Sequence, residues 1–294
     1  MKHLFSLIFI ACCCSISAQS LTIGDVNPQT VGVKAFSLSQ NTSVEISGTG
    51  GLFRDNYKFL VYYGWILDAK TRRIVWSSFS DIRDRRDNDD QGKYNFGKSI
   101  NLEAGNYELY FTGAYDSKSW SGSWGLANID DLIVEIFDSG DRDRFRRSQQ
   151  EELFVTVTGS GLLEINTSET VKDYVQNAFA YFVRAEDEEH FEQGFTLSKP
   201  SSIRVYSIGE GRKDDIFDFA WIYDANTHER VFEMNYRNTR HAGGADKNIR
   251  MDEIIDLPAG SYIVNYRTDD SHSYQSWNAL PPDDPQFWGV ALFP

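Results

Sequence analysis

The feature that most constrains the fold of this chain is an internal repeat. Four segments recur in the same order, at an offset that drifts only from 159 to 154 residues. They are FSLSQNTSVEI (36–46) with FTLSKPSSIRV (195–205), GWILDAKT (64–71) with AWIYDANT (220–227), INLEAGNYELYF (100–111) with IDLPAGSYIVNY (255–266), and YDSKSW (115–120) with DDSHSY (269–274). Ordered matches at a nearly constant offset indicate a duplicated domain. We therefore predict two copies of one domain, over residues 19–165 and 166–294.

Each copy is predicted to consist of β-strands. In SYIVNYR (261–267), Tyr262, Val264 and Tyr266 share one face, and NYELYFT (106–112) alternates in the same way. Strict alternation is the pattern of a half-buried strand, and no long amphipathic helix pattern competes with it. Short strands at regular spacing are typical of sandwiches and barrels. The predicted fold is all-β, with two tandem, jelly-roll-like β-sandwich repeats.

The first 18 residues predict the compartment. Lys2 and His3, the apolar run LFSLIFIA (4–11) and the small residue Ala18 form the three-part pattern of a secretory signal peptide. Eight apolar residues are too few to span a bilayer as a helix, and no later apolar run is long enough. We expect cleavage after Ala18 and export to the periplasm or the extracellular space. Lipoprotein processing at Cys12, which would leave the chain lipid-anchored, is the alternative.

The cysteines and the charge restrict the class of protein further. All three cysteines, Cys12 to Cys14, lie within the leader, so the mature chain has no disulfide and must be held by its core. The chain has a formal net charge of −14. Nucleic-acid binding needs lysine and arginine to displace phosphate counterions, so we expect no nucleic-acid partner. An acidic surface is compatible with solubility or with attraction of cations.

The order of motifs in each copy resembles two known families. The sequence L-x-A-G-x-Y (102–107 and 257–262), then Asp-Ser-x-Ser-aromatic, then the closing strand WGVALF (288–293) is similar to the second half of GOLD-type β-sandwich domains. The plan also resembles bacterial pre-peptidase C-terminal domains, which are secreted β-sandwiches with an Ala-Gly-x-Tyr turn before a strand. The resemblance implies a β-sandwich with an accessory, binding or interaction role, and it supplies no catalytic motif.

The repeat also separates residues of the fold from candidate functional residues. Positions shared by both copies are interpreted as core and turn, namely Trp65/Trp221, Asp68/Asp224 and Tyr107/Tyr262. The Asp-Ser-x-Ser-aromatic element is shared as well, so its Asp and Ser side chains are expected to bond the local backbone. The Pro-rich loop at 281–285 and the segment 240–248 belong to the second copy alone.

A ligand site is predicted in the second copy. Its candidate residues are Asp269, Asp270, His272, Tyr274, Trp277, Asn278 and Trp288. Aromatic rings stack on the CH groups of sugars, while carboxylate, amide and imidazole groups bind hydroxyls. The pattern therefore favours carbohydrate or another cell-surface polymer. The alternative is that Trp277 and Trp288 only close the end of the sandwich.

Calcium is the only cofactor that the sequence suggests. Calcium binds six to eight oxygen atoms, and DNDDQG (87–92) places Asp87 and Asp89 like the start of a calcium loop, although Lys98 stands where that loop has glutamate. The segment KDDIFD (213–218) offers a second group, Asp214, Asp215 and Asp218. The histidines lack the ligand spacing of a zinc site.

No catalytic motif is present in the sequence. There is no G-x-S-x-G, no H-E-x-x-H and no phosphate-binding loop. We therefore expect an exported, non-catalytic binding or interaction module, with carbohydrate as the leading ligand. The alternatives are a structural cell-envelope protein that engages a surface protein, and a hydrolase of unrecognised type.

Overall fold

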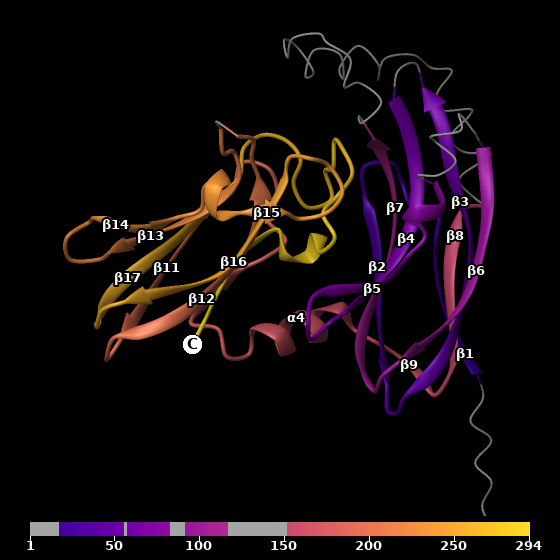
Figure 1. The fold of residues 1–294 in the computed structure, drawn as a ribbon, viewed down its shortest axis with the longest axis horizontal. Helices are drawn as coiled ribbons and strands as arrows, with labels where there is room; N and C mark the ends of the chain where they lie inside the picture. The colour runs from indigo at the N-terminus through magenta and orange to yellow at the C-terminus, as the bar shows by residue number, and fades with distance from the viewer. Residues whose placement is uncertain (1–17, 56–57, 83–91, 117–151, 214) are drawn as a thin grey trace, which may run out of the picture.

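The protein is all-β, with two β-rich units side by side (Figure 1). The computed structural model describes residues 18–55, 58–82, 92–116, 152–213 and 215–294. Residues 1–17 of the expected signal peptide, and the calcium candidates Asp87, Asp89 and Asp214, lie outside these ranges. Every ladder between the named strands is antiparallel. Among the described residues, no helix is long and apolar enough to cross a membrane.

The first unit is built from one large, continuous sheet. Its strand order is β1-β8-β3-β4-β7-β2-β9, with β5 added beside β4 and β6 beside β3. The last residues of β3, from Gly51 to Asp55, pair with β4, whereas its residues Val44 to Thr49 pair with β8. The strands are β1 (Ala18–Gly24), β2 (Val31–Leu38), β3 (Thr42–Asp55), β4 (Lys58–Asp68), β5 (Arg73–Ser77), β6 (Gly92–Leu102), β7 (Gly105–Asp116), β8 (Phe154–Ser160) and β9 (Leu162–Ile165).

The second unit is a sandwich of two separate sheets. One has the order β10-β18-β12-β16-β15 and the other β11-β17-β13-β14. Its elements are β10 (Ala180–Phe182), β11 (His190–Leu197), β12 (Ser201–Glu210), β13 (Phe219–Asp224), β14 (Arg230–Glu233), the 3₁₀ helix η2 (Tyr236–Asn238), β15 (Arg240–His241), β16 (Asn248–Leu257), β17 (Gly260–Arg267), the 3₁₀ helix η3 (Pro285–Phe287) and β18 (Gly289–Phe293).

A short helix joins the units. Ile165 ends β9 of the first unit, and α4 (Thr167–Val175) follows directly, at the position where the sequence repeat divides. The helix begins where the side chain of Asn166 accepts a hydrogen bond from the backbone N–H of Ser168, which satisfies one of the free amides of the first turn. In Figure 1, α4 lies between the two units.

The sequence repeat corresponds to a repeated strand order. The order β2-β7-β4-β5 in the first unit recurs as β11-β17-β13-β14, and β6-β3-β8 recurs as β16-β12-β18. Equivalent side chains meet in equivalent ways. In each unit a phenylalanine and a tyrosine on neighbouring strands stack at 5.4 Å, and the tyrosine hydroxyl donates to a carbonyl four residues earlier, at 2.9 Å. These residues are Phe36, Tyr107 and Glu103 in the first unit, and Phe195, Tyr262 and Pro258 in the second.

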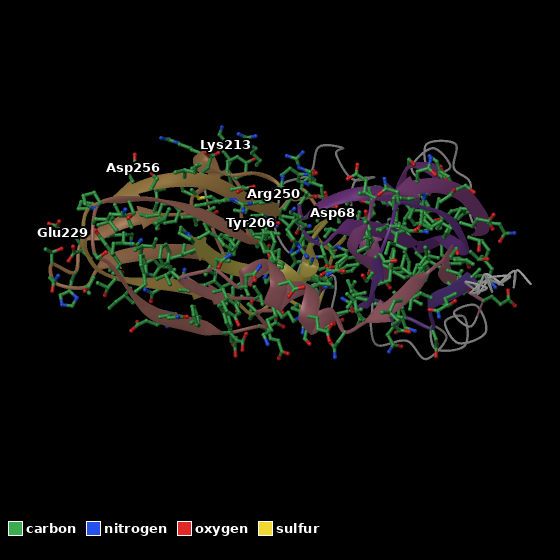
Figure 2. All side chains as sticks on the ribbon, turned by 90° about the horizontal axis from the view of Figure 1, so that it is seen from below. Asp68, Tyr206, Lys213, Glu229, Arg250 and Asp256 are labelled. Carbon is green, nitrogen blue, oxygen red and sulfur yellow. The ribbon has the colours of Figure 1, made fainter. Side chains whose placement is uncertain are left out.

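The shared aspartates build the same tight turn in both units. The Asp68 Oδ1 atom accepts hydrogen bonds from the backbone of Lys70 and Thr71, and Asp224 Oδ1 does so from the two equivalent amides. This arrangement fixes the turn between two antiparallel strands. In both copies the residue after the threonine of this turn has a positive φ, which is 54° at Arg72 and 58° at His228. Figure 2 shows that the two turns differ in position: Asp68 lies beside the second unit, whereas Glu229 lies at the outer end of the molecule.

Candidate functional site

The contact between the units is built around a buried arginine. Arg72 is 2% exposed, and its Nε and Nη2 atoms donate to both carboxylate oxygens of Asp284, at 2.9 and 2.5 Å. Its Nη1 and Nη2 atoms also donate to the two oxygens of Glu108, at 3.1 and 2.8 Å. The guanidinium lies 4.5 Å from the ring centre of Phe287. One side chain of the first unit thus joins β7 of its own sheet to the segment before η3 of the second unit.

The charges of this junction are strongly coupled. Burial would lower the pKa of Arg72, but the Asp284 and Glu108 carboxylates hold it well above its ordinary value. Burial would raise the pKa of Glu108, but Arg72, with hydrogen bonds from Thr170 and Tyr110, holds it below its ordinary value. For Asp284, burial outweighs the guanidinium, and its pKa is raised. Because each charge has a partner of opposite sign, these three groups can be buried together. Removing any one of them would leave a buried charge without its partner.

The segment SHSYQSWN (271–278), which contains four of the seven predicted ligand residues, contacts the first unit. The side chain of Gln275 accepts a hydrogen bond from the backbone N–H of Val31 and donates to its carbonyl, both at 3.0 Å. The backbone N–H of Trp277 donates to the carbonyl of Gln29 at 2.9 Å. His272 and Gln275 both have positive φ, 61° and 65°, a conformation that non-glycine residues adopt when surrounding contacts enforce it.

The aromatic candidates of this segment are buried. His272, Trp277 and Trp288 each have 0% exposure, and their rings pack edge to face with centres 5.1 to 5.5 Å apart. His272 Nε2 lies 2.6 Å from Asn248 Oδ1. Burial leaves none of the three rings a face on which a sugar could stack. Trp277 and Trp288 belong to the buried core, and His272 packs against both.

The remaining ligand candidates are nearer to the surface but do not form one face. Asp270 is exposed, and Tyr274 and Asn278 are partly buried. The backbone N–H of Tyr274 donates to the carbonyl of Ala185, and Asn278 Oδ1 accepts a hydrogen bond from Lys247 Nζ at 2.8 Å. Of the calcium candidates, Asp215 is exposed, whereas Asp218 is buried and lies beside Asp269.

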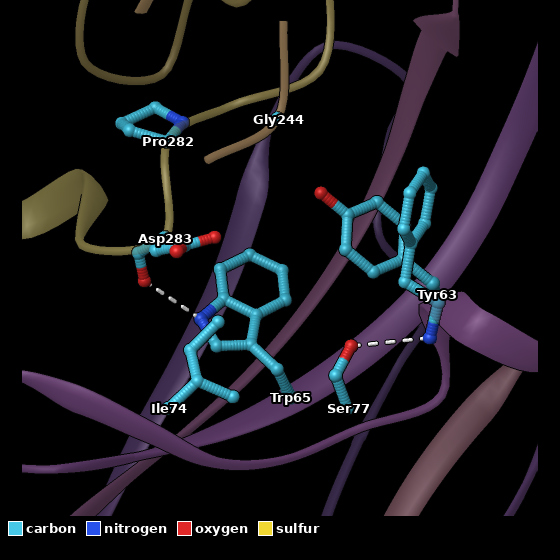
Figure 3. Close-up of a pocket in the computed structure, with 8 residues that line it drawn as sticks. Tyr63, Trp65, Ile74, Ser77, Gly244, Pro282 and Asp283 are labelled. Carbon is cyan, nitrogen blue, oxygen red and sulfur yellow. Dashed lines mark hydrogen bonds between the residues drawn. The ribbon is translucent and has the colours of Figure 1, made fainter. Parts of the chain in front are cut away.

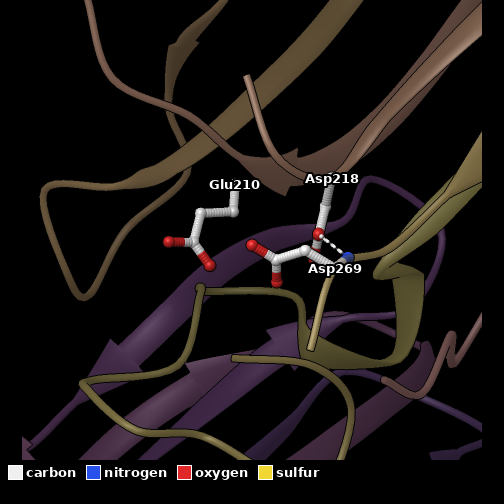
Figure 4. A group of neighbouring side chains, drawn as sticks. All are labelled: Glu210, Asp218 and Asp269. Carbon is white, nitrogen blue, oxygen red and sulfur yellow. Dashed lines mark hydrogen bonds between the residues drawn. The ribbon is translucent and has the colours of Figure 1, made fainter. Parts of the chain in front are cut away.

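The structure gathers three carboxylates at one end of the second unit. Glu210 ends β12, Asp218 directly precedes β13, and Asp269 follows β17; one carboxylate oxygen of each lies within 4.8 Å of the other two (Figure 4). Asp218 is anchored from both sides, because its Oδ1 accepts from the backbone N–H of Asp269 and its Oδ2 accepts from Trp288 Nε1, each at 2.9 Å. Glu210 Oε1 lies 3.0 Å from Lys247 Nζ.

The pKa values of all three carboxyls are raised. Burial raises the pKa of Asp218 to about 8 and that of Glu210 to about 7, and in Glu210 the nearby Lys247 opposes the shift. Burial also raises the pKa of Asp269, with the charges of Asp270 and Asp187 adding to it. Ionised carboxylates so close together repel one another. The sequence analysis named Lys247 only as part of the segment 240–248 and did not single out Glu210, which lies in no acidic motif.

A small hollow lies at the junction of the units. Its volume is about 70 Å³, and it is lined by Tyr63, Trp65, Ile74, Ser77, Phe79, Gly244, Pro282 and Asp283 (Figure 3). Trp65 Nε1 donates to the backbone carbonyl of Asp283 at 2.9 Å, which fixes one wall. Gly243 lets the Asp283 side chain sit where it does, because a Cβ there would lie 1.9 Å from Asp283 Oδ1 and the φ of Gly243 is +89°.

The aromatic walls of the hollow are themselves stacked. Trp65 stacks on Tyr63 at 5.2 Å and on Tyr110 at 4.9 Å, while Tyr63 also packs against Phe79 at 4.8 Å. The ring faces are therefore occupied, and the hollow offers ring edges, one carboxylate and the exposed side chain of Ile74. Burial raises the pKa of Asp283 to about 6; Arg250 and His241 oppose the shift, and Asp284 adds to it.

The fold and these sites define an all-β protein of two tightly joined β-sandwich-type units. No family model matches the chain, and no curated protein matches it. Solved structures show only faint overall likeness. A structure of Penaeus vannamei nodavirus has 10% identity and a TM-score of 0.15 over 86% of this chain and 82% of its own. A structure of Macrobrachium rosenbergii nodavirus has 9% identity and a TM-score of 0.17 over 95% and 97%.

Proposed function

We propose that this protein is an exported, non-catalytic interaction module that binds an extended segment of a partner protein along the edge of β5. The observation that carries the proposal is the outer edge of β5, beside the hollow, to which no other described strand is paired. In the described part of the chain, β5 pairs only with β4, and its residues Ile74 and Val75 are exposed. An exposed strand edge accepts another strand through main-chain hydrogen bonds, and adjacent pockets select its side chains.

The hollow specifies the side chain that the partner presents. Ile74 and Ser77 of β5 line the hollow together with the carboxylate of Asp283, so a strand added to β5 would place a side chain beside that carboxylate. The apolar stem of a lysine or arginine would contact the ring edges of the hollow, and its cationic end would pair with the Asp283 carboxylate. The net charge of −14 favours the approach of a basic partner. Carbohydrate binding has less support because the ring faces of Trp65 and Tyr63 are covered.

Short synthetic peptides test this proposal. Seven-residue peptides alternating threonine and valine around a central lysine, norleucine or glutamate are titrated into the protein, and Kd is measured by fluorescence anisotropy. A charge-assisted hydrogen bond contributes about 1.5–3 kcal/mol, so the lysine peptide should bind about ten- to a hundredfold more tightly than the norleucine peptide. Its advantage should shrink as the pH falls below about 6, where Asp283 becomes protonated.

Two matched variants decide the outcome. Asp283→Asn keeps the backbone carbonyl that Trp65 uses but removes the charge, so the lysine and norleucine peptides should bind alike. Asp256→Asn removes an exposed carboxylate on β16, far from the junction (Figure 2), and should leave the lysine preference unchanged. Equal affinities for all three peptides in the unmodified protein, or an unchanged preference in Asp283→Asn, would contradict the proposal.

A further inference from the structure

We propose that Glu210, Asp218 and Asp269 bind one calcium ion. This site is independent of the β5 edge and of any ligand bound there. The three carboxylates come from three strand ends that are distant in sequence, and one oxygen of each lies within 4.8 Å of the others. Calcium binds oxygen at about 2.4 Å, so two ligands on opposite sides of the ion lie about 4.8 Å apart. The cluster therefore has the size of a calcium coordination shell.

A buried carboxylate oxygen, unpaired among the described residues, supports a cation at this cluster. Glu210 is 4% exposed. Its Oε1 atom is paired with Lys247, while its Oε2 atom has no hydrogen-bond partner among the residues that the structure describes. Figure 4 shows the Glu210 carboxylate directed toward Asp269. A buried carboxylate oxygen without a partner is costly. Asp187, whose charge acts on Asp269, also has a buried oxygen, Oδ1, that no other described residue hydrogen-bonds.

The balance of charge favours a divalent ion. When all three carboxyls are ionised, as ligation of a cation requires, their three charges against the single ammonium of Lys247 leave two negative charges in a largely buried place. The next charges are Arg212 near Glu210 and the carboxylates of Asp187 and Asp270 near Asp269, so the surroundings stay negative. A divalent cation would neutralise this excess, which burial otherwise makes expensive.

The donor atoms favour calcium among divalent ions. All the proposed protein ligands are carboxylate oxygens, which suit hard cations. Calcium accepts six to eight oxygens in flexible geometry, including water and backbone carbonyls, whereas magnesium demands a near-ideal octahedron at about 2.0–2.1 Å. Carboxylates held by separate strand ends fit the more permissive ion. A bound calcium would tie the ends of β12, β13 and β17 together and stabilise the second unit.

Terbium luminescence tests the site directly. Tb³⁺ occupies calcium sites and emits when a nearby tryptophan is excited, and Trp288 donates to Asp218. Purified full-length protein, stripped with EDTA, should give sensitised emission that saturates at one Tb³⁺ per chain and is displaced by Ca²⁺ at concentrations where Mg²⁺ has little effect. In parallel, millimolar Ca²⁺ should raise Tm above its value in EDTA by several degrees.

Variants assign the ion to this cluster. Asp269→Asn, which keeps the oxygen that accepts from the backbone of Ser271, and Glu210→Gln should each weaken Ca²⁺ displacement at least tenfold, whereas Asp256→Asn should not. Asp269 is only half-buried, so its variant is expected to fold even if Glu210→Gln does not. Absence of sensitised emission and of a Ca²⁺-dependent Tm shift in the unmodified protein would overturn the proposal. So would full Ca²⁺ affinity in a folded Asp269→Asn variant.

Discussion

Arg72 shows how much of the junction depends on a single residue. Its guanidinium binds Glu108 of its own unit and Asp284 of the other with four hydrogen bonds. Glu108 also accepts from Tyr110 and Thr170, and Asp284 accepts from Tyr206 at 2.9 Å. Without the guanidinium, two carboxylates would remain buried with hydrogen bonds but no counter-charge.

Replacing Arg72 should therefore be strongly destabilising. Arg72→Met keeps much of the side-chain volume but leaves both carboxylates buried without a counter-charge. Removing one partner of a buried ion pair costs about 3–5 kcal/mol. Arg72→Lys keeps the charge but not the planar fork, so an intermediate loss is expected. Urea unfolding monitored by tryptophan fluorescence measures the free energy of unfolding.

The neighbouring arginine supplies the control for this prediction. Arg73 is exposed at the start of β5, so Arg73→Met should change the free energy of unfolding by no more than about 0.5 kcal/mol. If Arg72→Met and Arg73→Met unfolded at the same urea concentration, the junction would have no energetic importance.

At the scale of elements, the repeated turn is an internal comparison. Residues 68–72 and 224–228 share the aspartate, its two backbone hydrogen bonds and the positive φ at the last position. In the first unit that last position is the buried Arg72, and in the second it is His228, which is exposed. The same local structure thus carries the junction in one copy and faces solvent in the other.

This difference predicts unequal effects of the same substitution. Asp68→Ala and Asp224→Ala each remove an acceptor for two backbone amides and loosen the turn. Only Asp68→Ala also loosens the backbone that positions Arg72, so it should lower Tm clearly more than Asp224→Ala. Thermal unfolding followed by circular dichroism compares the two. A larger loss for Asp224→Ala would mean that the turn does not orient Arg72.

At the scale of the whole molecule, the junction should make the two units unfold together. It combines the buried ionic group, the hydrogen bond from Trp65 to Asp283, and the contacts of Gln275 and Trp277 with the first unit. Calorimetry of the full chain should show one transition with matching calorimetric and van't Hoff enthalpies.

Breaking the junction should separate that transition into two. The double variant Arg72→Met with Gln275→Ala removes contacts from both sides of the junction and replaces no apolar core residue, and two resolved heat-absorption peaks are expected. The double variant Arg73→Met with Asp256→Asn controls for altered surface charge and should keep a single peak. One peak in the junction variant would show that cooperativity arises elsewhere.

The sequence by itself determined the all-β class. Alternation of apolar and polar residues is a local pattern, and it can be recognised before the fold is known. It also determined the structural role of the paired aspartates Asp68 and Asp224, because a turn is built from neighbouring residues. The recurrence of these patterns in one order matches the recurrent strand order.

Only the tertiary structure decided which side chains are buried and which carboxylates meet. Trp277 and Trp288 are residues of a type that often lines ligand surfaces, yet packing across the sandwich buries both of them. Glu210, Asp218 and Asp269 stand in unrelated segments, and Arg72 and Asp284 in different units, because strand pairing and domain docking bring together residues that no sequence spacing connects. Burial and charge coupling are properties of that three-dimensional arrangement, which local patterns do not encode.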